Sequence, residues 1–137
     1  MTAPRLLSIN NYHYRRGGAE AVYLAHNSLF EENGWDVVPF AMRHPENLPA
    51  ASARHFVDEI EFGHTYGPLT KLKNASRVVY SFQARARIAD LIRETPPRIA
   101  HAHNVYHHIS PAIFPVLRKA GIPVATVELK NPLTGQR

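Results

Sequence analysis

The first quarter of the chain carries a short apolar run followed by a segment with helical periodicity. The run Arg5–Asn10 reads RLLSIN and leads through a polar, aromatic loop to Gly17 and Gly18, which predicts a strand that feeds a turn. Beyond the turn, apolar residues recur at helical spacing up to Asn33, and Gly34 is placed to end a helix. These recurring positions are Val22, Ala25 and Leu29.

The same alternation of strand and helix patterns continues to the end of the chain. The further strands are predicted at Trp35–Ala41, Arg98–His103 and Pro123–Val127, with a short one at His55–Val57 inside a loop-rich region. The further helices are predicted at Asn74–Thr95, capped by Asn74 and ended by Pro96 and Pro97, and at Pro111–Ala120, closed by Gly121. The longer helix is expected to bury Val78, Val79, Phe82, Ala86 and Ala89 and to turn Arg77, Arg87 and Glu94 to solvent.

This order of elements predicts an α/β fold in one domain. Helices between strands must bury their apolar sides on the sheet, so the sheet is expected to be doubly wound, mainly parallel and Rossmann-like. With the common strand order 3-2-1-4-5, the turn at Gly17 and the loop after His103 border one crevice, where ligands of such folds bind. The domain is expected to span residues 1–127, followed by an atypical tail at 128–137.

Composition narrows the class of protein. Hydrophobic residues make up 45% of the 137 and charged residues 20%, which is ordinary globular usage. The chain has no cysteine, so disulfides and thiolate chemistry are excluded, and the N-terminus has no signal-peptide pattern. These features lead us to expect a cytoplasmic protein. The net charge of +5 favours an anionic partner without identifying it.

Two glycines and a histidine segment are the candidates for chemistry. Gly17 and Gly18 let backbone N–H groups at a helix start approach a phosphate or sugar oxygen, although a turn that needs positive φ explains them equally well. Neither a dinucleotide-binding nor a P-loop glycine pattern is present. Alternation along a strand places His101 and His103 on one face, with His101 structural and His103 and Asn104 at the mouth.

Metal binding and nucleic-acid binding are weaker interpretations of the same residues. An H-x-H pair at a strand end can hold a metal ion, but the stretch 104–108 contains no carboxylate to complete the ligand set, so no metal is predicted. The basic, aromatic loop with Tyr12, Arg15 and Arg16 suits phosphate contacts. The other basic residues are scattered, and no groove-reading motif organises them, so nucleic acid is not expected as a partner.

The motifs GGAE at 17–20, NGWDV at 33–37 and IAHAHN at 99–104, in this order and on these elements, resemble the N-terminal domain of glycosyltransferase family 4. The resemblance covers about Leu6 to Val124 and implies the GT-B fold of two facing Rossmann-like domains. It implies retaining transfer of a sugar from a nucleotide-sugar donor to a saccharide or lipid-linked acceptor, without a cofactor or an obligatory metal. Gly17, Gly18 and Asn104 then face the donor, His103 lies beside the transferred sugar, and Tyr12, Arg15 and Arg16 lie on the acceptor side.

Two departures from the family change the expectation for this chain. The family continues after its last strand with a Thr-x-His-Asp-like stretch, whereas this chain reads Thr126-Val-Glu128, and the donor-binding half is not in the sequence. Alone, the chain is expected to be inactive and to need a partner domain or chain. The alternative is a non-catalytic binding module, either a remnant or a subunit of a split enzyme. Peripheral attachment to an anionic inner membrane face is expected from the positive charge.

Overall fold

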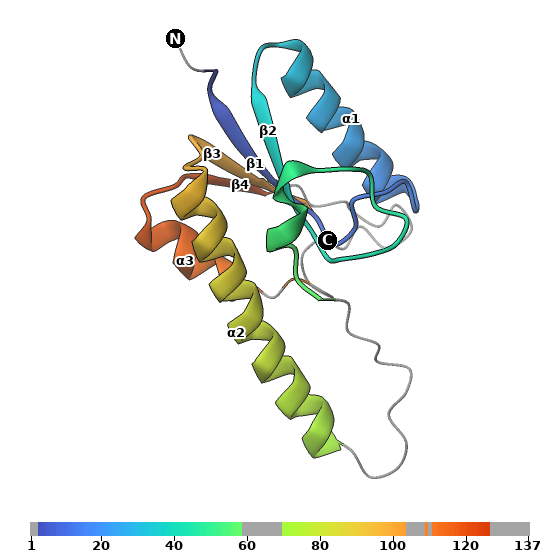
Figure 1. The fold of residues 1–137 in the computed structure, drawn as a ribbon, viewed down its shortest axis with the longest axis vertical. Helices are drawn as coiled ribbons and strands as arrows, with labels where there is room; N and C mark the ends of the chain where they lie inside the picture. The colour runs from blue at the N-terminus through green and yellow to red at the C-terminus, as the bar shows by residue number, and fades with distance from the viewer. Residues whose placement is uncertain (1–2, 59–69, 104–108, 110, 127–137) are drawn as a thin grey trace, which may run out of the picture.

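A computed structural model describes residues 3–58, 70–103, 109 and 111–126, with the backbone alone for 70–81 (Figure 1). Its centre is a parallel four-stranded sheet in the order β2-β1-β3-β4, as expected for an α/β, Rossmann-like domain. The strands are β1 (Arg5–Ile9), β2 (Asp36–Phe40), β3 (Ile99–Ala102) and β4 (Val124–Thr126). The helices are α1 (Gly18–Glu32), the 3-10 turn η1 (Ala51–His55), α2 (Thr70–Glu94) and α3 (Ile113–Lys119).

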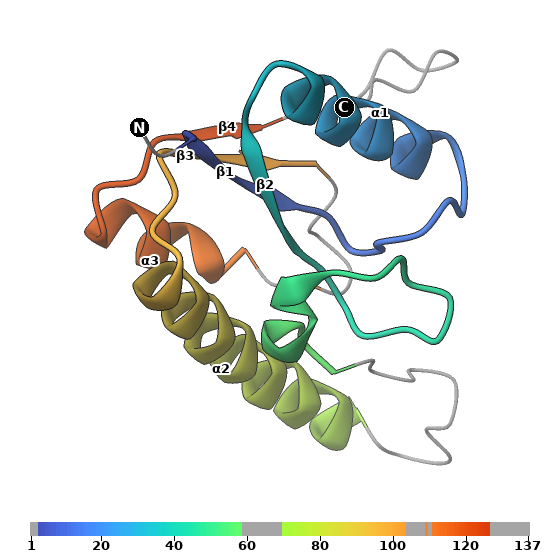
Figure 2. The same ribbon diagram turned by 45° about the horizontal axis from the view of Figure 1, so that its top comes forward.

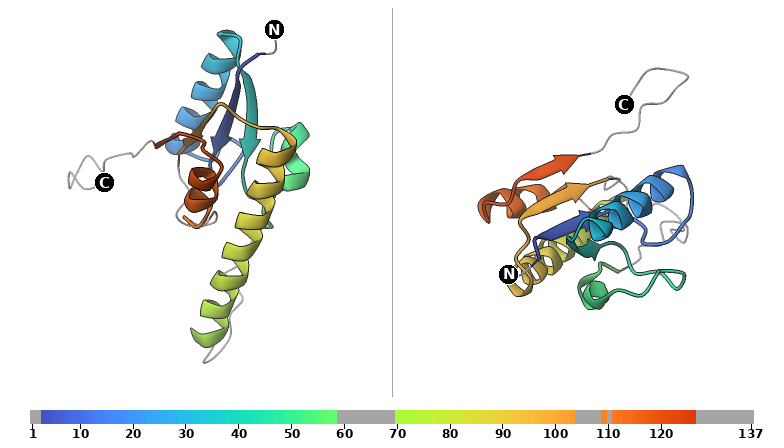
Figure 3. Two further views of the ribbon diagram at one scale, coloured as in Figure 1. Left: turned by 90° about the vertical axis from the view of Figure 1, so that its left-hand side faces the viewer. Right: turned by 90° about the horizontal axis from the view of Figure 1, so that it is seen from above.

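Helices cover both faces of the sheet. Helix α1 lies on one face, and α2 and α3 lie together on the other (Figures 2 and 3). Side chains along β1 alternate accordingly, because Leu7 and Ile9 join the core with α2 and α3 whereas Ser8 bonds to Asn27 of α1. The doubly wound arrangement is thereby confirmed.

The apolar core lies on the α2 and α3 side of the sheet. Three of the five β1 residues are fully buried aliphatics, and β3 contributes two alanines that let the helices approach closely. Hydrogen-bonded register aligns Leu7 with Val38 on one side and with Ala100 on the other, so one layer of side chains crosses three strands. The helices complete this core with Ala84, Ile88, Leu91, Ile113 and Leu117.

Helix α1 buries a polar side, contrary to the sequence prediction. Its buried residues are Glu20, Tyr23 and Asn27, while Leu29, expected on the apolar side, is 56% exposed. The sheet face under α1 carries Ser8 and two histidines, which need polar partners. The helix therefore turns its polar side to the sheet, and its aliphatic side chains are left less buried.

The buried face and the start of α2 also differ from the prediction. The helix begins at Thr70, so Asn74 lies inside it and is not its cap. Its buried positions are Ala84, Ile88 and Leu91, while Phe82 is 63% exposed. Only the C-terminal half of the helix covers the sheet, and the first half extends beyond it (Figures 1 and 3). The packing of this half selects the row with the larger aliphatic side chains. Val78 and Val79 lie outside the described side chains.

The loop-rich region after β2 forms less strand than predicted. His55 belongs to η1, and Val57 makes a single parallel bridge with Met42, beyond the end of β2. The predicted third strand is thus reduced to one residue pair, but it lies beside β2, where the expected strand order places it. Gly34 and Gly121 end α1 and α3 with φ of 86° and 76°, as predicted.

The predicted tail at 128–137 lies outside the described residues, so the domain boundary stays a prediction. Within the part of the chain that the structure describes, no helix is long and apolar enough to cross a membrane.

Candidate functional site

The carboxyl ends of β1 and β3, where the sequence predicts a crevice, are neighbours at the point where the winding of the sheet reverses. Backbone hydrogen bonds continue past the strand ends: His103 N–H donates to the Ile9 carbonyl at 2.8 Å, and Asn10 N–H donates to the Phe40 carbonyl at 3.1 Å. The three strand ends are therefore held together, and His103 has a fixed position at their edge.

His103 is only 8% exposed, and its ring is surrounded by aromatic rings. Its centroid lies 4.4 Å from that of His101 and 5.3 Å from those of His26 and Tyr23. Burial, with the nearby imidazoles of His101 and His26, lowers the pKa of His103 to about 4. The ring is therefore neutral at physiological pH. Its Nε2 is buried and has no hydrogen-bond partner among the described residues.

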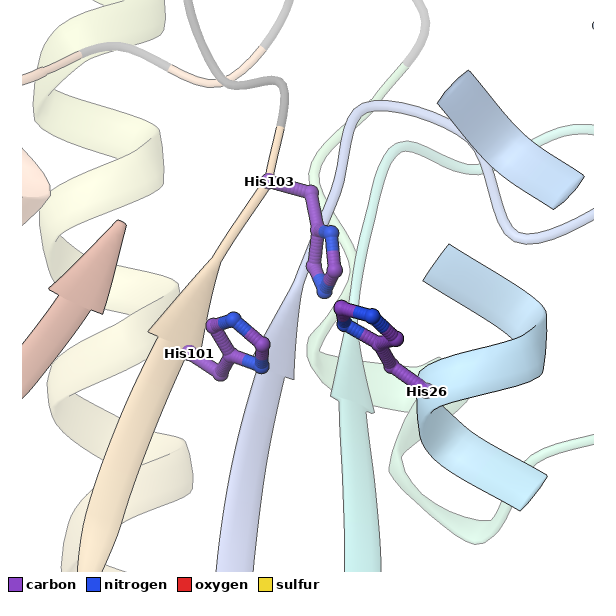
Figure 4. Close-up of side chains that lie close together, drawn as sticks. All are labelled: His26, His101 and His103. Carbon is purple, nitrogen blue, oxygen red and sulfur yellow. The ribbon is translucent and has the colours of Figure 1, made fainter. Parts of the chain in front are cut away.

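Two further histidines complete a cluster with His103 (Figure 4). His26 of α1 stacks on His101 of β3, with centroids 5.4 Å apart and ring planes inclined by 14°. One ring nitrogen from each of the three histidines lies within 4.8 Å of the other two. The shared face of His101 and His103 is confirmed. His26 was missed, because the sequence pattern assigned the sheet-facing side of α1 to other residues.

Tyr23 and His13 tie α1 to the loop after β1. The fully buried Tyr23 hydroxyl and His13 Nδ1 are 2.8 Å apart, and the His13 ring also lies edge-on to Phe56. Burial raises the pKa of Tyr23 and lowers the pKa of His13. Both groups are therefore neutral, and their hydrogen bond fixes the loop beside the histidine cluster.

The predicted acceptor-side loop is well anchored. Asn10 Nδ2 donates to the Tyr12 carbonyl at 2.8 Å, and the Ile109 N–H donates to Asn11 Oδ1 at 3.1 Å. Tyr12 is largely buried, and the Arg16 guanidinium lies 4.3 Å from its ring centroid. Arg15 and Arg16 are exposed at the surface.

An aromatic pair extends this surface. Tyr14 and His44 are stacked with centroids 4.5 Å apart and ring planes inclined by 25°. His44 comes from the segment after β2, so two loops that are distant in sequence contribute to one aromatic surface next to Tyr12. The first loop was predicted from the sequence, but this pairing was not, because nothing in the sequence pattern indicates which aromatic residue after β2 contacts that loop.

The glycine pair starts α1 without a left-handed conformation. Gly17 is the N-cap residue with extended backbone, φ −162° and ψ −163°, and neither glycine has positive φ. The alternative explanation by a turn that needs positive φ is therefore wrong. A Cβ atom at Gly18 would meet nothing within 4 Å, whereas one at Gly17 would lie 3.6 Å from Glu20 Oε2, so the first turn is open on the side of Gly18. The first N–H groups of a helix lack intrahelical acceptors and suit an anion there.

The remaining predicted site residue, Asn104, lies outside the described residues. A separate pocket of about 330 Å³ lies between β2, η1 and α2, where Glu94 pairs with Arg54 and His55. It contains none of the predicted site residues, and it borders Asp36, at the start of β2, which is the opposite end of the strand from the histidine cluster.

Comparison with known proteins gives no further assignment: no protein-family model, curated protein or solved structure matches the chain. The function is therefore inferred from the fold, the positions of the site residues and the sequence motifs.

Proposed function

We propose that the chain is the acceptor-side, Rossmann-like domain of a GT-B glycosyltransferase that transfers a sugar from a nucleotide-sugar donor to a saccharide or lipid-linked acceptor. The observation that carries this proposal is the position of His103. A neutral, buried imidazole stands at the carboxyl end of β3 where the sheet winding reverses, on the same side of the sheet as the helix that Gly17 and Gly18 open.

In this proposal the two features of the crevice have separate roles. The open N–H groups of the first turn of α1, next to Gly18, bind the donor phosphate. A neutral His103 forms a hydrogen bond with the sugar and adds no positive charge close to the anomeric carbon, where positive charge develops in the transition state. A second domain or a partner chain anchors the nucleotide.

The acceptor surface in this proposal is formed by the two loops beside the crevice. The stacked pair of Tyr14 and His44 offers a flat aromatic surface for a saccharide ring, and the exposed Arg15 and Arg16 suit a phosphate such as that of a lipid-linked acceptor. The hydrogen bond of His13 to Tyr23 fixes the first of these loops relative to α1.

The proposal is tested by NMR titration of the ¹⁵N-labelled chain with UDP- and GDP-sugars, with the free sugars as controls. We expect weak binding that shifts the amide signals of Gly17 to Glu20 and the ring signals of His103, without shifts at Gly121. No turnover is expected from the chain alone, because one wall of the cleft does not fix both substrates. Absence of shifts at millimolar donor, or shifts confined to other residues, would contradict the proposed function.

A further inference from the structure

The three clustered histidines leave polar atoms without partners. Nε2 of His103 and Nδ1 of His26 are both buried and have no hydrogen-bond partner among the residues that the structure describes. A buried polar atom without a partner is destabilising, so native proteins seldom keep two of them in one cluster. His103 is 92% removed from solvent, as its exposed fraction is 8%.

The geometry of the cluster fits a ligand that accepts electron pairs from several imidazoles at once. The three rings come from α1, from β3 and from the residue that follows the end of β3, and they face one another (Figure 4). Their nearest ring nitrogens lie within 4.8 Å of one another. A Zn–N bond of about 2.0–2.1 Å places two nitrogens on a tetrahedral ion about 3.4 Å apart, so modest rotations of the side chains would close the site.

We propose that His26, His101 and His103 form a binding site for a divalent transition metal ion of the zinc type. Such an ion would bind one ring nitrogen from each of the three histidines and would join α1 directly to β3. The sequence argued against a metal because no carboxylate follows Asn104. In the proposed site the third ligand is instead an imidazole, from a helix that is distant in sequence.

The chemistry of the ligand set selects the ion. Imidazole suits Zn²⁺, Cu²⁺, Ni²⁺ and Co²⁺, whereas Mg²⁺ and Ca²⁺ require oxygen ligands, and this cluster consists of imidazoles alone. Three protein ligands leave one position of a tetrahedral ion for water or for an oxygen atom of a ligand. This inference goes beyond the proposed function, because the proposed sugar transfer does not require a metal and uses His103 without a positive charge beside it. Zinc-bound and donor-bound His103 are therefore alternative states of one side chain, so zinc binding is measured without a donor and donor binding on the zinc-free chain.

The test is zinc titration of the chain purified without a histidine tag, by calorimetry and by metal analysis after dialysis. We expect one Zn²⁺ per chain. His26→Gln, His101→Gln and His103→Gln should each weaken binding by about tenfold or more, which corresponds to about 1.4 kcal/mol. His44→Gln and His55→Gln remove histidines outside the cluster and should change the affinity less than about twofold, a small effect on the same scale. The double variant His107→Gln/His108→Gln serves as a control for the neighbouring histidines.

A second measurement uses the wild-type chain and does not depend on the folding of any variant. Zn²⁺ that binds only the native state should raise the Tm of the wild-type chain as its concentration rises, whereas Mg²⁺ should not. Co²⁺ substitution should give the intense visible absorption of a four-coordinate site. The proposal is overturned if zinc neither binds nor stabilises the wild-type chain, or if the His44→Gln, His55→Gln or His107→Gln/His108→Gln variants lose as much affinity as the cluster variants.

Discussion

His13 shows how one buried residue makes stability depend on pH. Its ring is buried, and burial lowers its pKa from 6.5. The unfolded chain therefore takes up a proton at this residue at a higher pH than the folded chain, so folding stability is lost as the pH falls below about 6.5. Each unit of pKa difference corresponds to about 1.4 kcal/mol at most.

We therefore expect the free energy of unfolding in urea to fall between pH 7.5 and pH 5.5, a window above the range where carboxylates titrate. His13→Gln should be less stable at pH 7.5, because the Tyr23 hydroxyl loses its imidazole partner, and should lose less stability on acidification. An identical pH dependence in wild type and variant would mean that burial of His13 does not contribute.

The orientation of a single side chain was predictable from the sequence only where one secondary-structure element determines it. His101 and His103 share a face because strand side chains alternate, and no other information is needed. His26 joins them across the interface with α1, and that contact depends on which side of the helix meets the sheet. A pattern based on hydrophobicity cannot indicate this side when the sheet face beneath the helix is polar.

The two ends of α1 use glycine for different reasons, which gives a matched pair of variants. Gly18 has open space around its missing Cβ and no positive φ, so alanine fits and improves helix propensity. Gly34 has φ of 86°, which strains any residue with a Cβ. Gly18→Ala should leave stability unchanged or raise it by up to about 1 kcal/mol, whereas Gly34→Ala should lower it by about 1 kcal/mol.

The substitutions Gly18→Ala and Gly34→Ala should affect donor binding in the opposite way from stability. Under the proposed function, a methyl group at Gly18 blocks the approach of the donor to the N–H groups of the first turn, so Gly18→Ala should lose the donor-induced NMR shifts. Gly34→Ala, at the far end of the helix, should keep them at a temperature where it is folded. Full donor binding by Gly18→Ala would show that this turn is not the phosphate site.

Elements were predicted better in position than in packing. Both long helices form near the expected residues, because glycine and proline mark their ends, as Gly34 and the prolines after Glu94 do. The buried faces of both were wrong, because each helix contains more than one row of apolar residues. Tertiary packing determines which row is buried. For α1 the polar partners on the sheet beneath it decide, and for α2 the partial overlap of the helix with the sheet decides.

At the scale of the whole molecule, the order of elements was sufficient to predict the sheet. Alternation of strands and helices implies parallel strands and right-handed crossovers, and the common strand order then places the ends of β1 and β3 side by side. The loops that complete the crevice were less predictable. Their contacts, such as that of Tyr14 with His44, join segments that are far apart in the sequence. No periodic pattern of residues indicates which of these segments meet.

The charge of the whole molecule leads to a prediction about membranes. Arg15 and Arg16 are exposed beside the crevice, whereas Arg54 forms an ion pair with Glu94 that compensates its charge. A basic residue near an anionic surface contributes about 1 kcal/mol to attachment. If the acceptor is lipid-linked, as the proposed function allows, the surface with Arg15 and Arg16 is the one that faces the membrane.

We expect the chain to co-sediment with vesicles that contain phosphatidylglycerol and to be released as salt rises from about 0.05 to 0.5 M, because salt screens surface charge. The double variant Arg15→Gln/Arg16→Gln should bind about thirtyfold more weakly, since two contributions of about 1 kcal/mol each are removed. Arg54→Gln removes one positive charge, at a compensated position, and should bind like wild type. An equal loss of affinity per charge removed in the two variants would show that net charge alone attracts the chain, and binding to neutral vesicles would exclude the electrostatic mechanism.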